Sequence, residues 1–233
     1  MVILARLLIK YGKEGPLSYL SHLELTRSIE RSFRRAGINV RMSSGFNPRP
    51  KFSYGPALPV GTGSCAEYML VDLEDEIPEN ELLNRISCVL PKGLAIYIAK
   101  YIEKKVSLVN LVQSASYRVS AEVNAAEDDI IKAIGLVKSQ KCLQVTHKGK
   151  QKWVETSKAI LDLSLRCRNG NTVEFYLLLS LGSQDSIRPE AVFAQLAEKL
   201  PEKTSCRLLE ISRLEQFVNQ GEPLMNILDF MKV

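Results

Sequence analysis

Histidine, tryptophan and paired cysteines are scarce in this sequence. It has two histidines, one tryptophan and five widely spaced cysteines, none of which forms a C-x-x-C pair. An odd number of scattered cysteines argues against a disulfide framework and shows no zinc or iron–sulfur spacing. Two histidines are too few for a histidine-rich metal site. We therefore expect no metal and no cofactor.

Long apolar runs and nucleotide-binding motifs are also missing. No apolar run reaches the ~18 residues that a transmembrane helix needs, and Arg6 and Lys10 interrupt the apolar N-terminus. The chain has no G-x-x-x-x-G-K-[ST], G-x-G-x-x-G or G-x-S-x-G motif, so nothing supports a nucleotide hydrolase, a dinucleotide oxidoreductase or a serine hydrolase. These absences predict a cytoplasmic protein without a membrane partner.

Length and charge distribution are more informative. The 233 residues suffice for two domains, and 45% hydrophobic with 24% charged residues is an ordinary globular composition. Residues 1–66 carry ten basic and three acidic side chains, a net charge of +7 within a chain total of +5. Such asymmetry favours an anionic partner for the first segment, nucleic acid being the commonest, although a solvated basic surface is the alternative.

The first half reads as β-α-β-β-α-β. Alternation predicts strands at 3–10, 38–42, 66–73 and from 94, the last with Ile96, Ile98 and Ile102 on one face. A capping box at Ser21–Glu24 begins a helix that Gly37 ends, and Pro78 opens a second helix. A long Gly/Pro-rich loop, 43–61, follows the second strand.

The second half nearly repeats this order. Strands are expected from Tyr117, near 141–148 and 159–167, at 173–181 after an Asn169-Gly170 turn, and at 206–211, with helices from Glu127 and Pro189. We predict an α+β protein of two ferredoxin-like (βαββαβ) domains, each an antiparallel sheet with helices on one face. The domains are expected at 1–110 and 111–212, followed by a C-terminal tail at 213–233.

A basic stripe marks the first helix. Arg27, Arg31, Arg34 and Arg35 fall at i, i+4, i+7 and i+8, so they share one face opposite Ile29 and Phe33. The spacing also allows Glu30–Arg34 and Glu24–Arg27 ion pairs, typical of a solvated face. Because the following loop is also basic, anion binding is the favoured interpretation.

The loop 43–61 interleaves aromatic and basic residues. Phe46, Phe52 and Tyr54 offer stacking surfaces, while Arg49 and Lys51 offer phosphate contacts, a combination typical of single-stranded nucleic-acid binding. Its prolines would stiffen the segment and lower the entropy lost on binding. The alternative is an ordered loop whose aromatic rings close over the core.

Two further features are ambiguous. His22 lies in the first helical turn, where a neutral imidazole is favoured, but its sequence neighbours form no diagnostic acid–base arrangement. Residues 138–152 carry five lysines and His147 without an acidic residue. They either extend a nucleic-acid track or protect a sheet edge from aggregation.

Four blocks carry a family resemblance. They are Leu20-Ser-His-Leu-Glu24, Glu30-Arg-Ser-Phe-Arg-Arg-Ala-Gly37, Gly45-Phe-Asn-Pro-Arg-Pro-Lys51 and Ala57-Leu-Pro-Val-Gly61. In these the chain resembles the radical-SAM-associated bacterial domain family of unknown function, which implies a role as partner to a radical-SAM enzyme. Relatives commonly have aspartate at Glu24 and histidine at Arg49. The chain lacks C-x-x-x-C-x-x-C, so it is not itself the radical-SAM catalyst.

The resulting hypothesis is an RNA-binding accessory protein, not itself an enzyme, that presents ribosomal or transfer RNA to a radical-SAM modification enzyme. No DNA partner is expected. The candidate RNA-binding residues are His22, Arg27, Arg31, Arg34, Arg35, Phe46, Asn47, Arg49, Lys51 and Tyr54. Two alternatives are a metal-independent endoribonuclease that uses His22, and a protein-interaction module for the radical-SAM partner.

Overall fold

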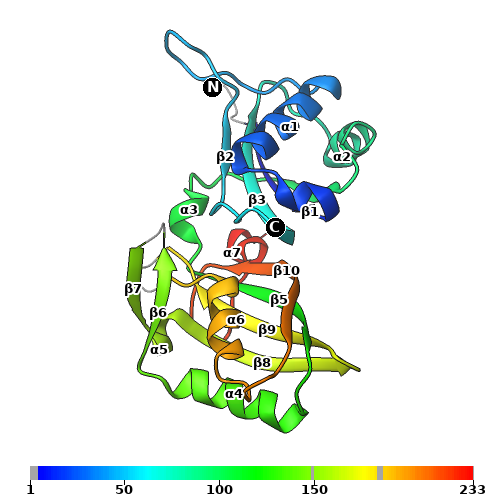
Figure 1. Cartoon of the computed structure of the whole chain (residues 1–233). Helices are drawn as coiled ribbons and strands as arrows, with labels where there is room; N and C mark the ends of the chain where they lie inside the picture. The colour runs from blue at the N-terminus through cyan, green and yellow to red at the C-terminus, as the bar shows by residue number, and fades with distance from the viewer. Residues whose placement is uncertain (1–4, 148–149, 183–185, 233) are drawn as a thin grey trace. The chain divides into compact units, whose positions relative to one another are not determined.

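Two compact units make up the protein. The computed structural model describes residues 5–147, 150–182 and 186–232 (Figure 1). The first unit comprises Met1–Leu111 and Asn226–Val233, and the second comprises Val112–Met225. The whole is of the α+β class, with mostly antiparallel strands and helices. No helix in the described part of the chain is long and apolar enough to cross a membrane.

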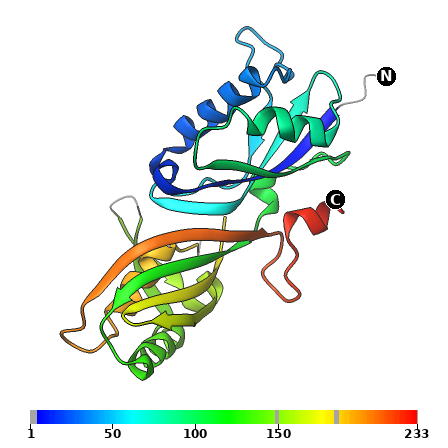
Figure 2. The ribbon, with the colours of Figure 1, turned by 90° about the vertical axis from the view of Figure 1, so that its right-hand side faces the viewer.

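The first unit is built on four antiparallel strands. They follow the order β4-β1-β3-β2. The strands are β1 (Ala5–Lys13), β2 (Phe52–Tyr54), β3 (Thr62–Leu73) and β4 (Leu94–Tyr101), and the helices are η1 (Gly15–Tyr19), α1 (His22–Arg35), α2 (Glu79–Ser87), α3 (Leu108–Leu111) and α7 (Ile227–Met231). Helices α1 and α2 cover one face of the sheet (Figure 2).

The core of the first unit follows the sequence pattern. Alternate residues of β1 (Ala5, Leu7, Ile9) meet Leu25, Ile29 and Phe33 of α1. This is the face that the helical spacing predicts to be buried, because residues three and four apart share one side of a helix.

Two expectations for this sheet are wrong. Residues 38–42 form only isolated bridges, Val40 to Leu73 and Met42 to Pro50, so the second strand is β2, inside the predicted loop. In β4 the pairing with β1 shifts between Lys10 and Tyr11. This bulge reverses the alternation, because one extra residue exchanges the two faces. Ala99 and Tyr101 therefore join Ile96 in the core.

Four antiparallel strands of the second unit follow the order β10-β5-β9-β8, and β6 and β7 form a separate hairpin. The elements of this unit are β5 (Ser114–Val123), α4 (Glu127–Ser139), β6 (Cys142–His147), β7 (Lys150–Glu155), α5 (Thr156–Ala159), β8 (Ile160–Asn169), β9 (Thr172–Ser180), α6 (Pro189–Ala197) and β10 (Cys206–Phe217). Strand β10 continues past residue 212, where the predicted second domain ends. The tail beyond it turns at a cis Glu222–Pro223 bond and ends in α7.

A single core holds the second unit together. Ile130 and Val137 of α4 and Val192 of α6 pack on the sheet residues Val119 and Phe175. The β8–β9 hairpin turns at Asn169-Gly170, as the sequence predicts, and Gly170 has the positive φ of 60° that such a turn requires.

Candidate functional site

Helix α1 begins with a complete capping box. The Ser21 backbone N–H and hydroxyl both donate to the Glu24 carboxylate, at 2.9 and 2.7 Å, and Ser21 Oγ accepts from the Glu24 backbone N–H at 3.3 Å. These hydrogen bonds from Ser21 lower the pKa of Glu24. The cap therefore fixes where the helix starts, and with it the direction in which each arginine points.

All four arginines of the stripe are exposed on α1. Neither of the ion pairs that the spacing allows is present. The Glu24 carboxylate accepts hydrogen bonds from Ser21, and no ion pair joins Glu30 to Arg34. Arg31 Nε donates to the Arg27 carbonyl at 3.2 Å, and Arg35 donates to the carbonyl of Val89. The guanidinium groups of Arg31 and Arg35 are thus held by backbone carbonyls and keep further donors for an anion.

The stripe borders a concave surface that we name the arginine hollow. It has a volume of about 370 Å³ and is lined by Ser28, Arg31, Arg34, Arg35 and Pro91. Three guanidinium groups and a hydroxyl line it, and no carboxylate does. Guanidinium groups bind phosphate through paired, charge-assisted hydrogen bonds, so the chemistry of this hollow suits a phosphate.

The loop after α1 is closed at its base. Met42 and Pro50 form a bridge, the Ser43 N–H donates to the Arg49 carbonyl at 2.8 Å, and the Arg49 N–H donates to Ser43 Oγ at 3.0 Å. The phenyl ring of Phe46 is fully exposed (106%), and the loop projects from the unit in Figure 1. Asn47 and Arg49 are exposed and Lys51 is half-buried.

Tyr54 belongs to an aromatic cluster. Its ring meets the exposed His22 edge-on at 5.4 Å and stacks with Phe52 at 6.0 Å, and Phe52 meets Phe33 edge-on at 5.2 Å. The Tyr54 hydroxyl is buried without a hydrogen-bond partner among the described residues. Burial, with a smaller contribution from the Glu30 charge, raises the pKa of Tyr54.

His22 has a ring neighbour but no acid–base partner. Within the described ranges its imidazole makes no hydrogen bond or ion pair, so a nucleophile and an orienting group are not assembled around it. The same ranges contain no group of three side chains that would hold a metal ion.

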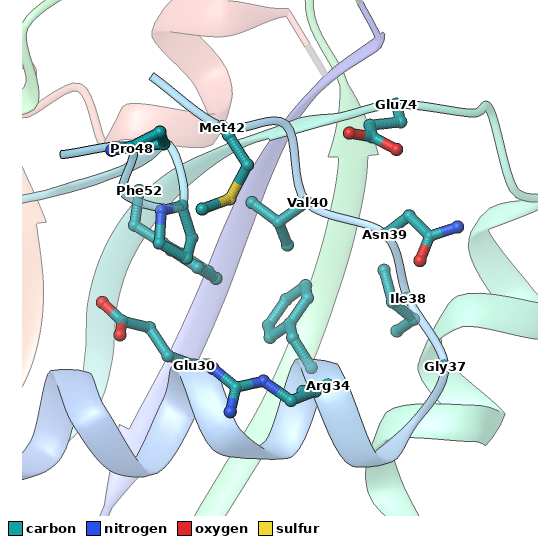
Figure 3. A pocket seen from close by; sticks show the side chains of 12 residues that line it. Glu30, Arg34, Gly37, Ile38, Asn39, Val40, Met42, Pro48, Phe52 and Glu74 are labelled. Atoms are coloured by element: carbon teal, nitrogen blue, oxygen red, sulfur yellow. The ribbon is translucent and has the colours of Figure 1, made fainter. Parts of the chain in front are cut away.

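A second hollow lies on the other side of α1, and we name it the loop hollow (Figure 3). It has a volume of about 470 Å³ and is lined by Glu30, Phe33, Arg34, Gly37, Ile38, Asn39, Val40, Met42, Pro48, Pro50, Phe52 and Glu74. Arg34 lines both hollows. Of its lining, Arg34 is among the candidate RNA-binding residues, and Phe52 is among the aromatic residues that the sequence offers as stacking surfaces.

The sequence does not reveal the loop hollow, because its lining comes from separate parts of the chain. Glu74 and Asn39 are far apart in the chain and meet because the Glu74 N–H donates to the Asn39 carbonyl at 3.0 Å. The one usable signal was Glu30, a carboxylate placed inside an arginine-rich helix.

The lysine-rich segment 138–152 lies in the second unit. Lys138 pairs with Asp162 at 3.4 Å. Lys141 directly precedes β6, and His147, Lys150 and Lys152 belong to the β6–β7 hairpin, whereas Lys148 falls outside the described residues. Trp153 on this hairpin is largely exposed. The nucleic-acid track and the edge protection both stay predictions.

These features define a two-unit α+β protein with an arginine-lined surface in its first unit. The chain belongs to the bacterial family described as "Uncharacterized protein conserved in bacteria (DUF2344)", whose model matches residues 6–189. No curated protein matches it.

Solved structures resemble the chain at low identity. One is a chain of "Crystal Structure of a Cbf5-Nop10-Gar1 Complex", with a TM-score of 0.51, 11% identity, and coverage of 97% of this chain and 54% of that one. Another belongs to "Structure of H/ACA RNP bound to a substrate RNA containing 2'-deoxyuridine", with a TM-score of 0.48, 8% identity, and coverage of 89% and 47%. This chain spans about half the length of either. Identity this low bears on the fold alone.

Proposed function

We propose that the protein is a cytoplasmic RNA-binding accessory factor that presents ribosomal or transfer RNA to a radical-SAM modification enzyme. The observation that carries the RNA part is the arginine hollow, where Arg31, Arg34 and Arg35 surround a space without a carboxylate. Arginines of this kind position a nucleic acid through its phosphates, independently of sequence.

The loop supplies a stacking surface for an RNA base. Phe46 is fully exposed on a loop whose base is closed by hydrogen bonds between Ser43 and Arg49. A base that stacks on an exposed aromatic ring gains ~1–3 kcal/mol. A ring held on a closed loop loses little entropy on binding, so Phe46 with Asn47 and Arg49 would engage unpaired bases.

The role of the remaining candidates follows from their positions. His22 and Arg27 lie on the N-terminal half of α1 and would extend the phosphate track along the helix. Lys51 lies in the same loop, directly before β2, and would add a phosphate contact. Tyr54 supports the His22 ring, so it would act by holding His22 in place.

The partner and the domain type are also part of this proposal. The radical-SAM enzyme is inferred from the four sequence blocks that resemble the radical-SAM-associated family. The ferredoxin-like assignment is supported by the strand orders, β4-β1-β3-β2 and β10-β5-β9-β8, which match once the β6-β7 hairpin is set aside. In each unit the first and last strands are neighbours, as the βαββαβ arrangement requires.

The test compares two double variants. Arg31→Ala with Arg34→Ala removes two charges from the arginine hollow, whereas Lys132→Ala with Arg207→Ala removes two exposed charges from the second unit. Affinity for a fluorescent single-stranded RNA is measured by anisotropy across a range of salt concentrations. Each lost phosphate contact lowers the slope of log K against log[salt] by ~0.7, so the first variant should lose about 1.4 and the control nothing.

Two outcomes would contradict the proposal. Equal affinity and slope for both double variants would remove the arginine hollow from the RNA site. Recovery of the radical-SAM enzyme with the protein after nuclease treatment, together with no measurable RNA binding, would favour the protein-interaction module instead.

A further inference from the structure

The loop hollow combines an apolar interior with a polar rim. Phe33, Phe52, Val40 and Met42 supply flat or flexible apolar surface, and its volume of about 470 Å³ lies within the ~300–1,000 Å³ of small-ligand sites. Figure 3 shows Glu30 and Arg34 on α1 facing Val40, Met42 and Phe52 across the hollow. A planar ring system of about one nucleobase fits between such walls.

Four polar side chains stand at the rim, namely Glu30, Arg34, Asn39 and Glu74. None of the four has a hydrogen-bond or ion-pair partner within the part of the chain that the structure describes. Glu30 and Arg34 are one helical turn apart, so an acceptor pair and a donor group lie side by side above the apolar interior.

This order of acceptors and donors matches one base better than the others. The Watson–Crick edge of guanine offers two adjacent donors, N1–H and N2–H, followed by the acceptor O6. A carboxylate accepts both donors at once, and a neighbouring guanidinium donates to O6. Adenine, cytosine and uracil each offer only one donor group on that edge, so they use one carboxylate oxygen. Proteins read unpaired RNA bases on such edges while stacking them on aromatic rings.

We propose that the loop hollow binds an unpaired guanine of the RNA whose neighbouring phosphate lies in the arginine hollow. Glu30 accepts from the guanine N1–H and N2–H, and Arg34 donates to O6. Arg34 lines both hollows and joins the base site to the phosphate site. This inference rests on the proposed function and adds base specificity to it.

The test uses two nine-nucleotide uridine RNAs that differ only at the centre, one with guanine and one with adenine. Wild-type protein should bind the guanine RNA about tenfold more tightly, the discrimination of one good paired contact. Glu30→Gln keeps the size of the side chain and replaces one acceptor oxygen with a donor, so the preference should fall below about threefold. Glu81→Gln on α2 is the matched control for the lost charge and should keep the preference.

The outcomes separate the two proposals. Equal binding of both RNAs by the wild-type protein, with the salt slope still dependent on Arg31 and Arg34, overturns the guanine site and leaves the RNA-binding function intact. A guanine preference that survives Glu30→Gln overturns the role of Glu30. Binding of neither RNA overturns the guanine site together with the proposed function.

Discussion

Replacing Tyr54 with phenylalanine should make the first unit more stable. The Tyr54 hydroxyl is buried and has no hydrogen-bond partner among the described residues, whereas its ring packs against His22 and Phe52. A buried hydroxyl without a partner costs ~1–3 kcal/mol. The substitution removes that cost and leaves the ring contacts in place, so the free energy of unfolding should rise by about 1 kcal/mol or more.

Tyr101→Phe is the matched control, with the opposite expected sign. The Tyr101 hydroxyl donates to the Ile77 carbonyl and accepts from the Ile77 N–H, both at 2.9 Å. Its removal leaves these backbone groups unpaired, so the variant should lose ~1–3 kcal/mol. The same chemical change therefore stabilises at one position and destabilises at the other.

The pH dependence gives an independent check on Tyr54. Burial raises the pKa of Tyr54, while an unfolded tyrosine loses its proton near pH 10. Above about pH 10 the folded protein therefore binds more protons than the unfolded chain, and stability falls as pH rises, by up to ~1.4 kcal/mol per pH unit from this group. The advantage of Tyr54→Phe over the wild type should therefore grow between about pH 9 and pH 11.

The assay must report on the first unit. The single tryptophan, Trp153, lies in β7 of the second unit, so its fluorescence follows the wrong part of the chain. Urea unfolding is instead followed by hydrogen exchange of peptides that cover β2 and β3. If Tyr54→Phe lowers stability as Tyr101→Phe does, the Tyr54 hydroxyl has a hydrogen-bond partner and the reasoning is wrong.

Variants at three further positions test local structure, two in the first unit by the same assay and one in the second unit by Trp153 fluorescence. Ser21→Ala removes the N-cap of α1 and should cost ~1 kcal/mol, while Ser21→Asp keeps a capping oxygen and should cost much less; equal losses would mean that the cap is not what matters. Gly12→Ala places a Cβ 2.6 Å from the Ser64 carbonyl oxygen and should cost ~1–3 kcal/mol. Gly135→Ala in helix α4 meets nothing within 4 Å and should stabilise the second unit by up to ~1 kcal/mol, so a loss there would count against the argument.

Helix α1 was predictable because its signals are local. The Ser21–Glu24 capping box starts it, and Gly37, with a φ of 66°, follows its end. Each of these depends on neighbours three or four residues away. The buried face at Ile29 and Phe33 follows from the same spacing.

Strand β2 and the bulge in β4 were not predictable, because both depend on distant partners. The pattern at 38–42 and the pattern at 52–54 are both compatible with a strand. Residues 38–42 make only one isolated bridge to β3, whereas Phe52–Tyr54 pair with β3 at three consecutive residues. In β4 the apolar residues Ile96 and Ile98 alternate correctly for a regular strand. The bulge against β1 changes which of them faces the helices.

The candidate site also has one part that the sequence predicts and one part that it does not. The basic stripe on α1 is a property of one helix, so the sequence identifies it. The loop hollow forms only where α1, the segment after it and the end of β3 come together. The residues next to Glu74 in the sequence do not indicate that Glu74 lines this hollow. The missing Glu30–Arg34 ion pair is a matter of side-chain conformation, which spacing alone does not determine.

The first unit is made from two pieces of chain, Met1–Leu111 and Asn226–Val233, with the 114 residues of the second unit between them. Helix α7 belongs to the second piece, and the Phe230 carbonyl there accepts a hydrogen bond from Lys104 at 3.1 Å, while the Phe230 ring lies 4.8 Å from the same ammonium group. During translation the second unit is complete before α7 has been synthesised. The first unit therefore gains α7 only after the whole second unit has been synthesised, so the unit whose synthesis begins first completes its fold second.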